Sequence, residues 1–122
     1  MAEHVGVFGS TARAVAQTYN SPDIANDEGG TGLVLVIDVT AATSSPSVVF
    51  TIQGKDPASG KYYTILASSA ITGTGTTVLR VHPDLTAAAN SVAKDMLPAV
   101  WRVSAAHGNT NSITYTVGAS MV

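Results

Sequence analysis

Residues 47–67 read SVVFTIQGK, DPASG and KYYTILA in succession, and this stretch decides the fold. In the first segment Val48, Phe50 and Ile52 alternate with more polar residues, which is the period of a strand with one buried face. The second segment has turn chemistry, because Pro57 presets φ and Gly60 supplies a positive φ. The stretch therefore predicts a β-hairpin, with strands over 47–55 and 61–67 and a projecting tip at 56–60.

Further short strands are predicted on both sides of this hairpin. Strands over 99–105 and 112–119 flank the loop 107–111, and we expect them to form a second hairpin. Weaker patterns predict strands over 76–82 and 12–20. The apolar run from Leu33 to Val39 does not alternate, which favours a strand covered on both faces, either at the centre of a sheet or under a neighbouring subunit. Asp38 interrupts this run, either as a buried acid paired with an arginine or, as we favour, as the end of the strand.

Residues 84–98 carry a helical pattern. Apolar side chains recur at helical spacing over 85–96, after a candidate N-cap at Asp84 and before Pro98. This segment allows one helix of about three turns. The predicted fold class is therefore all-β: a mostly antiparallel β-sandwich or barrel with at most one short helix. We expect a single domain over residues 12–122, preceded by residues 1–11 as either an N-terminal arm or an ordinary frayed terminus.

The alternating strands also predict a core. Trp101 could be either a core residue or an exposed platform on which a sugar stacks. Its place beside Val103 on a strand favours burial. The predicted core residues are Phe50, Ile52, Trp101, Val103, Tyr115 and Val117.

The composition favours a protein that is covered by other proteins. The 122 residues are 45% hydrophobic and 11% charged, against roughly 25% charged in an average soluble domain. Hydroxyl and amide side chains fill the polar positions, and covering them costs less than desolvating a Lys/Glu surface. The net charge of −2 and the scattered basic residues argue against nucleic-acid binding. Apolar runs are too short to span a bilayer, and we expect no signal peptide and synthesis in a cytoplasm.

The candidate chemistry is sparse. The chain has no cysteine, which excludes disulfides, thiolate nucleophiles and cysteine-ligated zinc. His4, His82 and His107 share no strand or helical spacing that would place two of them on one metal ion. The sequence contains no Gly-x-Ser-x-Gly motif. We therefore expect a protein that is not an enzyme, with no catalytic, cofactor-binding or metal-ligating residues and no cofactor.

Four segments carry a resemblance to a known family: VFTIQGKDPASGKYYTILA at 49–67, LTAAAN at 85–90, LPAVWRV at 97–103 and ITYTVGAS at 113–120. From about Leu33 to the C-terminus, the chain resembles small structural proteins of tailed bacteriophages, of the minor capsid or head-decoration (cement) type. The resemblance implies a virion protein on the capsid surface, present in many copies or as a homo-oligomer, that binds the major capsid protein of the phage head and stabilises the shell. It also leaves open a phage tail or head–tail joining protein. A separate alternative is a carbohydrate-binding β-sandwich on the virion surface.

Candidate interface residues come from three places in the sequence. The first is the N-terminal arm, whose apolar side chains could anchor on a neighbour. The second is the apolar run over 33–39, and the third is the tyrosine pair beside the hairpin turn, of which one ring should be exposed. The candidates are Val5, Val7, Phe8, Leu33, Leu35 and Tyr62.

Overall fold

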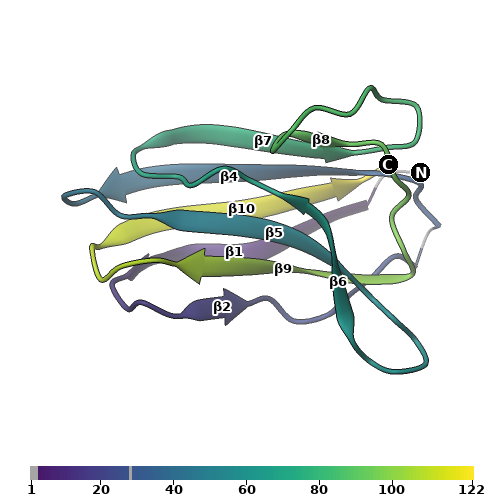
Figure 1. Cartoon of the computed structure of the whole chain (residues 1–122), viewed down its shortest axis with the longest axis horizontal. Coiled ribbons are helices and arrows are strands. Elements are labelled where there is room, and N and C mark those ends of the chain that lie inside the picture. The colour runs from purple at the N-terminus through teal and green to yellow at the C-terminus, as the bar shows by residue number, and fades with distance from the viewer. Residues whose placement is uncertain (1–2, 28) are drawn as a thin grey trace.

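A computed structural model describes residues 3–27 and 29–122 as an all-β chain (Figure 1). In chain order the strands are β1 (Glu3–Arg13), β2 (Thr18–Asn20), β3 (Ile24–Ala25), β4 (Leu33–Ala42), β5 (Val48–Lys55), β6 (Tyr62–Ala67), β7 (Gly75–Val81), β8 (Val92–Ala93), β9 (Val100–His107) and β10 (Ile113–Met121). Sheet A has the order β1-β10-β4-β7-β8, and sheet B has the order β2-β9-β5-β6 with β3 also paired to β9. All pairings are antiparallel except that between β7 and β8. The two sheets do not close into a barrel, so the predicted all-β class is confirmed in its sandwich form.

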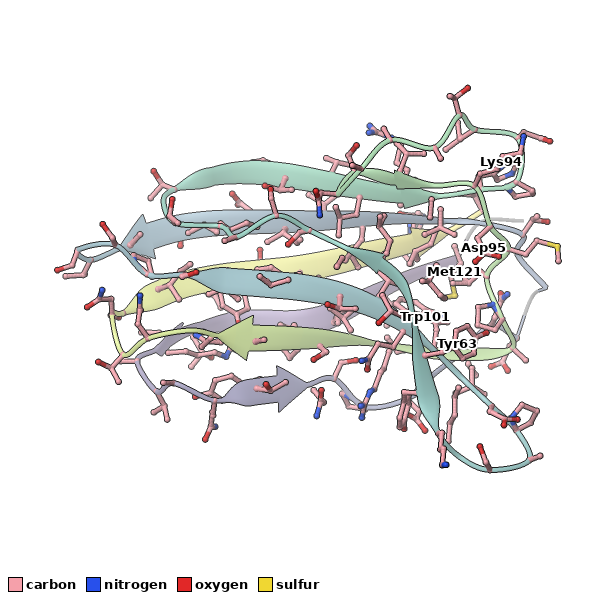
Figure 2. The ribbon with its side chains drawn as sticks, viewed as in Figure 1. Tyr63, Lys94, Asp95, Trp101 and Met121 are labelled. Atoms are coloured by element: carbon pink, nitrogen blue, oxygen red, sulfur yellow. The ribbon has the colours of Figure 1, made fainter. Side chains whose placement is uncertain are left out.

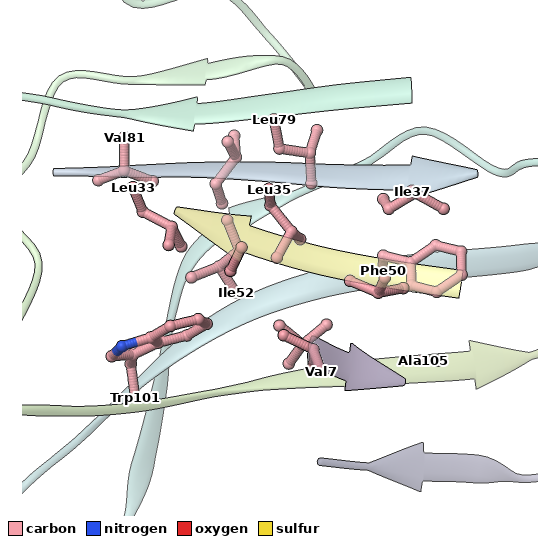
Figure 3. Packing of buried hydrophobic residues seen from close by; sticks show 14 of the residues in the cluster. Val7, Leu33, Leu35, Ile37, Phe50, Ile52, Leu79, Val81, Trp101 and Ala105 are labelled. Atoms are coloured by element: carbon pink, nitrogen blue, oxygen red, sulfur yellow. The ribbon is translucent and has the colours of Figure 1, made fainter. Parts of the chain in front are cut away.

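The core lies between the two sheets, where alternate residues of the long strands meet (Figure 3). On β5, Val48, Phe50 and Ile52 are fully buried while the residues between them are half-exposed. Sheet A contributes Leu35, Ile37 and other aliphatic side chains to the same cluster. The six predicted core residues are confirmed, with exposed fractions of 0–1%: Phe50, Ile52, Trp101, Val103, Tyr115 and Val117.

The predicted hairpin over 47–67 is confirmed as β5 and β6. At its tip the amide of Asp56 donates to the carbonyl of Lys61 at 2.8 Å, and the amide of Gly60 donates to the carbonyl of Asp56 at 2.9 Å. Gly60 has φ 74°, the left-handed conformation that glycine adopts without strain. Figure 1 shows this tip projecting away from the two sheets.

The predicted second hairpin is wrong, because β9 and β10 lie in different sheets. The loop between them crosses from sheet B to sheet A and is tied to the neighbouring crossing between β4 and β5. The side-chain amides of Asn109 and Asn111 both donate to the carbonyl of Ser45, at 2.9 and 3.1 Å. The amide of Gly108 donates to the carbonyl of Ser47 at 2.8 Å. These hydrogen bonds hold the loop in its path from one sheet to the other.

The helix expected near residues 84–96 does not form. Asn90 has a positive φ of 61°, and Ala88 and Val92 exchange backbone hydrogen bonds of 3.0 Å across a tight turn. Two of the apolar positions that suggested a helix remain in water, since Leu85 is 36% and Met96 65% exposed, and a third, Val92, pairs with β7 as part of β8. Without a buried face, the weak helix propensity of the Thr, Asn and Ser residues here is not offset.

Strand β4 also differs from expectation. Asp38 lies in the middle of β4 rather than at its end, half-buried, where it accepts a hydrogen bond from the Thr76 hydroxyl at 3.4 Å. The strand is central within sheet A, but only one of its faces is covered by this chain, because a sandwich covers each sheet on one side. Val36, on the other face, is 38% exposed.

The N-terminal part of the chain is paired to sheet A. Residues 3–11 of the predicted arm belong to β1, which runs antiparallel to β10 from Glu3 opposite Met121 to Arg13 opposite Ile113. Residues 1–2 lie outside the described part. The strand predicted over 12–20 is divided by residues 14–17 into the end of β1 and the short β2.

Candidate functional site

The outward side of sheet A carries the least charged broad surface of the sandwich. Its central row crosses four strands, with Gly6 opposite Gly118, Gly118 opposite Val36 and Val36 opposite Val78. Gly6 and Val36 are exposed, and Gly118 and Val78 are half-buried. The row is therefore apolar and has no side chain at two of its four positions.

Two further rows flank this centre, two residues away along each strand. They are Thr116–Asp38–Thr76 on one side and His4–Ser120–Val34–Arg80 on the other. We call these three rows together the sheet A face. Apart from His4, its charged residues are one acid and one base, Asp38 and Arg80. Among the residues whose side chains the structure describes, neither forms an ion pair.

A shallow cleft extends one end of the sheet A face. Its volume is about 330 Å³, and its walls include Val34, Arg80, Leu85 and Val122. Leu85 and Val122 are 36% and 46% exposed, so apolar surface continues from the face into the cleft. The arrangement can bind an apolar protein surface.

The structure corrects the candidate interface residues on β4. Leu33 and Leu35 are 1% and 0% exposed and face the core, so they cannot meet a partner while the chain is folded. The outward apolar residues of this strand are Val34 and Val36. A signal for this orientation was present in the sequence, because counting back in twos from the polar Asp38 leads to Val36 and Val34.

The candidate anchors on the N-terminal segment contact this chain's own core. Val7 is 8% exposed, and Val5 and Phe8 are partly buried against the core cluster. The ring of Phe8 packs edge-on against Tyr115, with centroids 6.1 Å apart. In this conformation the three side chains hold β1 to the sandwich.

Tyr62 belongs to a polar cluster on the outward side of sheet B. Its hydroxyl donates to Asp23 at 2.6 Å, and the same carboxylate accepts from Lys55 at 2.8 Å. Hydrogen bonds from Lys55 and then Tyr62 lower the pKa of Asp23, and the Asp23 carboxylate raises the pKa of Lys55. The Arg102 guanidinium lies 3.4 Å from the centroid of the Tyr62 ring and donates to Gln53 at 2.8 Å. Tyr62 is therefore engaged by its own chain, and we call this group the sheet B cluster.

The more exposed tyrosine is Tyr63, which stands at the end of the sandwich together with the buried Trp101 (Figure 2). Its ring occupies the space where a Cβ on Gly54 would lie. It forms one wall of a cleft of about 490 Å³ between the hairpin tip and residues 98–100. Trp101 is 0% exposed and has no free face on which a sugar could stack.

A second group of aromatic rings surrounds Arg13 at the other end of the core. The guanidinium carbon lies 4.6 Å from the centroid of Tyr115, 5.5 Å from that of Tyr19 and 5.4 Å from that of Phe8. The buried His107 shares a 2.9 Å hydrogen bond with the Tyr115 hydroxyl. Burial and then Arg13 lower the pKa of His107, while burial raises the pKa of Tyr115 to about 12. Both shifts favour the neutral forms of His107 and Tyr115.

The three histidines lie in separate parts of the sandwich. His4 shares a 3.0 Å hydrogen bond with the Ser120 hydroxyl on the sheet A face, and the Nδ1 of His82 accepts from the amide of Asp84 at 3.1 Å. Within residues 3–27 and 29–122, no three His, Asp or Glu side chains gather as a metal site would require.

Over the same residues, no helix has the length and apolar character needed to cross a membrane. The geometry leaves the sheet A face as the candidate functional site, since its apolar centre is open and Asp38 and Arg80 have no ionic partner among the described side chains. Comparison with models of known protein families, with curated proteins and with solved structures finds no match for this chain.

Proposed function

We propose that this chain is a structural protein of a tailed-bacteriophage virion, a head-decoration (cement) or minor capsid protein that acts by binding protein surfaces rather than by catalysis. The observation that carries the proposal is the sheet A face. Three valines, two glycines and several hydroxyl side chains lie side by side there, with only Asp38 and Arg80 charged. Such a surface is inexpensive to desolvate and is suited to burial against protein.

The resemblance to phage structural proteins supports the same role. Its four segments fall on β5 and β6, the 85–90 loop, the start of β9, and β10. They include core residues such as Trp101 and Val117, and β10 also supplies Thr116 and Gly118 to the sheet A face. The four segments thus contain both core residues and residues of the sheet A face.

A decoration role needs no chemistry beyond association. A protein that binds only the assembled shell stabilises it by mass action, and many copies on one shell add their contributions. Because few charges are available, the binding should be mainly apolar and should weaken little as salt is raised.

The test is cosedimentation of the purified chain with expanded, empty heads and, separately, with tails of its own phage, at low and high salt. We expect saturable binding to heads at both salt concentrations, none to tails, and heads that resist heating better when decorated. Saturable binding to tails alone would transfer the proposal to a tail or head–tail joining role. Binding to neither particle would overturn the virion proposal.

A further inference from the structure

We propose that the sheet A face is the interface of a symmetric homodimer, in which two copies pack face to face across the row Gly6–Gly118–Val36–Val78. The inference names the partner of the surface described above and rests on the proposed function only in taking that surface as protein-binding. Three observations carry it: the two glycines, the positions of the two charged residues, and the area of the face.

Neither steric contact nor a positive φ requires the two glycines, although Gly6 does precede a register shift in the β1–β10 pairing. A Cβ added at Gly6 or at Gly118 would meet no heavy atom within 4 Å, and neither residue has a positive φ. Glycine is nevertheless unfavourable in strands, because it loses the most conformational freedom and packs no side chain. Here two glycines lie opposite each other on adjacent strands. The close approach of another backbone explains a flat, paired position of this kind.

The charges are arranged in a way that is complementary to a second copy. Asp38 on β4 lies one row to one side of the central row, and Arg80 on the adjacent β7 lies one row to the other side. A two-fold axis along the central row exchanges the two flanking rows. It therefore brings Asp38 of one copy close to Arg80 of the other. Seen along the normal to the sheets, the two residues are about one strand spacing of 4.8 Å apart, and the two sheets lie about 10 Å from each other. An arginine side chain spans that separation, and the symmetry produces the pair twice.

The same axis matches the uncharged positions. Val36 of one copy faces Val36 of the other, Val78 faces Val78, and the glycines face each other. The three rows alone, across four strands about 4.8 Å apart, cover about 400 Å² per copy. The contact therefore takes in the full outward side of these strands, which are about nine residues long, and measures roughly 19 by 31 Å, or about 600 Å² per copy. The pair would bury roughly 1,200 Å², which exceeds the roughly 1,000 Å² expected of a specific interface and predicts a dimer of modest affinity.

The dimer is tested by sedimentation velocity of the full chain over roughly a hundredfold range of concentration around the micromolar. We expect a reversible monomer–dimer equilibrium. Val36→Lys should abolish it, whereas the matched control Val49→Lys, on the outward side of central strand β5 in sheet B, should leave it unchanged.

Two further variants separate the dimer from folding. Gly118→Thr should leave the monomer at least as stable to urea, because the added side chain has open space, yet weaken dimerisation by about tenfold or more. Asp38→Arg and Arg80→Asp should each weaken the dimer, and the double exchange should restore it. Recovery in the double variant is specific to the two-fold geometry, since a general loss of charge would not produce it.

Three outcomes would overturn the inference: a wild-type chain that stays monomeric throughout the range, a dimer that survives both Val36→Lys and Gly118→Thr, or a dimer lost equally in Val49→Lys. A monomeric chain that binds heads, and loses that binding in Val36→Lys, would make the face a shell contact instead. A dimer that binds neither heads nor tails would leave this inference standing while the virion role fails, so the two proposals are judged separately.

Discussion

Trp101 provides the sharpest test of how the core is held together. The indole is 0% exposed, and its Nε1–H has no hydrogen-bond acceptor among the described residues. A buried tryptophan removes about 150–250 Å² from water, which corresponds to about 4–6 kcal/mol at about 25 cal/mol per Å². Replacements of large aromatic core residues by alanine cost about 3–5 kcal/mol in practice, and we expect Trp101→Ala to lower the free energy of unfolding by that amount.

The informative comparison is Trp101→Phe. Phenylalanine keeps most of the apolar contact and removes the unpaired N–H, whose burial costs about 1–3 kcal/mol. The two effects oppose each other, so we expect the free energy of unfolding to change by less than about 1 kcal/mol. Urea denaturation followed by far-ultraviolet circular dichroism measures both variants, since the single tryptophan is lost as a fluorescent probe. A loss above about 2 kcal/mol in Trp101→Phe would show that the indole N–H has a partner, and a loss below about 1 kcal/mol in Trp101→Ala would refute burial in the core.

Three further predictions concern protonation and backbone contact. The pKa of His107 is lowered on folding, so the unfolded chain binds the proton more tightly. The contribution of His107 to stability should therefore be fully present above about pH 6.5 and fall as the pH drops below it, and His107→Gln should flatten this part of a urea-midpoint profile. The pKa of Tyr115 is raised from 10.0 to about 12, so stability should fall as the pH rises between those values, and Tyr115→Phe should remove this dependence from the midpoints measured in alkali. Gly32→Ala should cost about 1–3 kcal/mol in thermal or urea unfolding, because its Cβ would overlap a backbone carbonyl of β7. Gly73→Ala, whose Cβ would meet nothing within 4 Å and which lies outside the sheet A face, is its control, and equal losses would contradict the packing described.

The strands and the core could be predicted because alternation reports burial directly. Phe50, Ile52 and Trp101 each lie on a face where every second residue is apolar, and all three are fully buried. The sheet that each strand joins is not encoded in that pattern. The loop between β9 and β10 could close a hairpin or cross between sheets, and Asn109 and Asn111 decide this by binding Ser45, more than 60 residues away in the chain.

The failed helix and the misplaced interface have related causes. The helical spacing over 85–96 includes two alanines, which bury little area, and its larger members Leu85 and Met96 stay exposed. In the run from Leu33 to Val39 every residue but Asp38 is apolar, so apolarity alone could not tell the core face from the open face. The phase of that strand is set by its polar residue, Asp38, which must remain on the side open to water.

The charged side chains on the two outward faces of the sandwich differ in whether this chain itself supplies their partners. In the sheet B cluster, Asp23, Lys55, Tyr62 and Arg102 already engage one another, so a partner covering them would desolvate charged groups whose best contacts are made. On the sheet A face, a partner would meet open valines, glycines without neighbours, and an acid and a base that lack ionic partners among the described side chains. Covering the sheet B cluster removes charged groups from water and adds few new contacts. Covering the sheet A face buries apolar surface and can complete two ion pairs. Association with another protein should therefore proceed through the sheet A face.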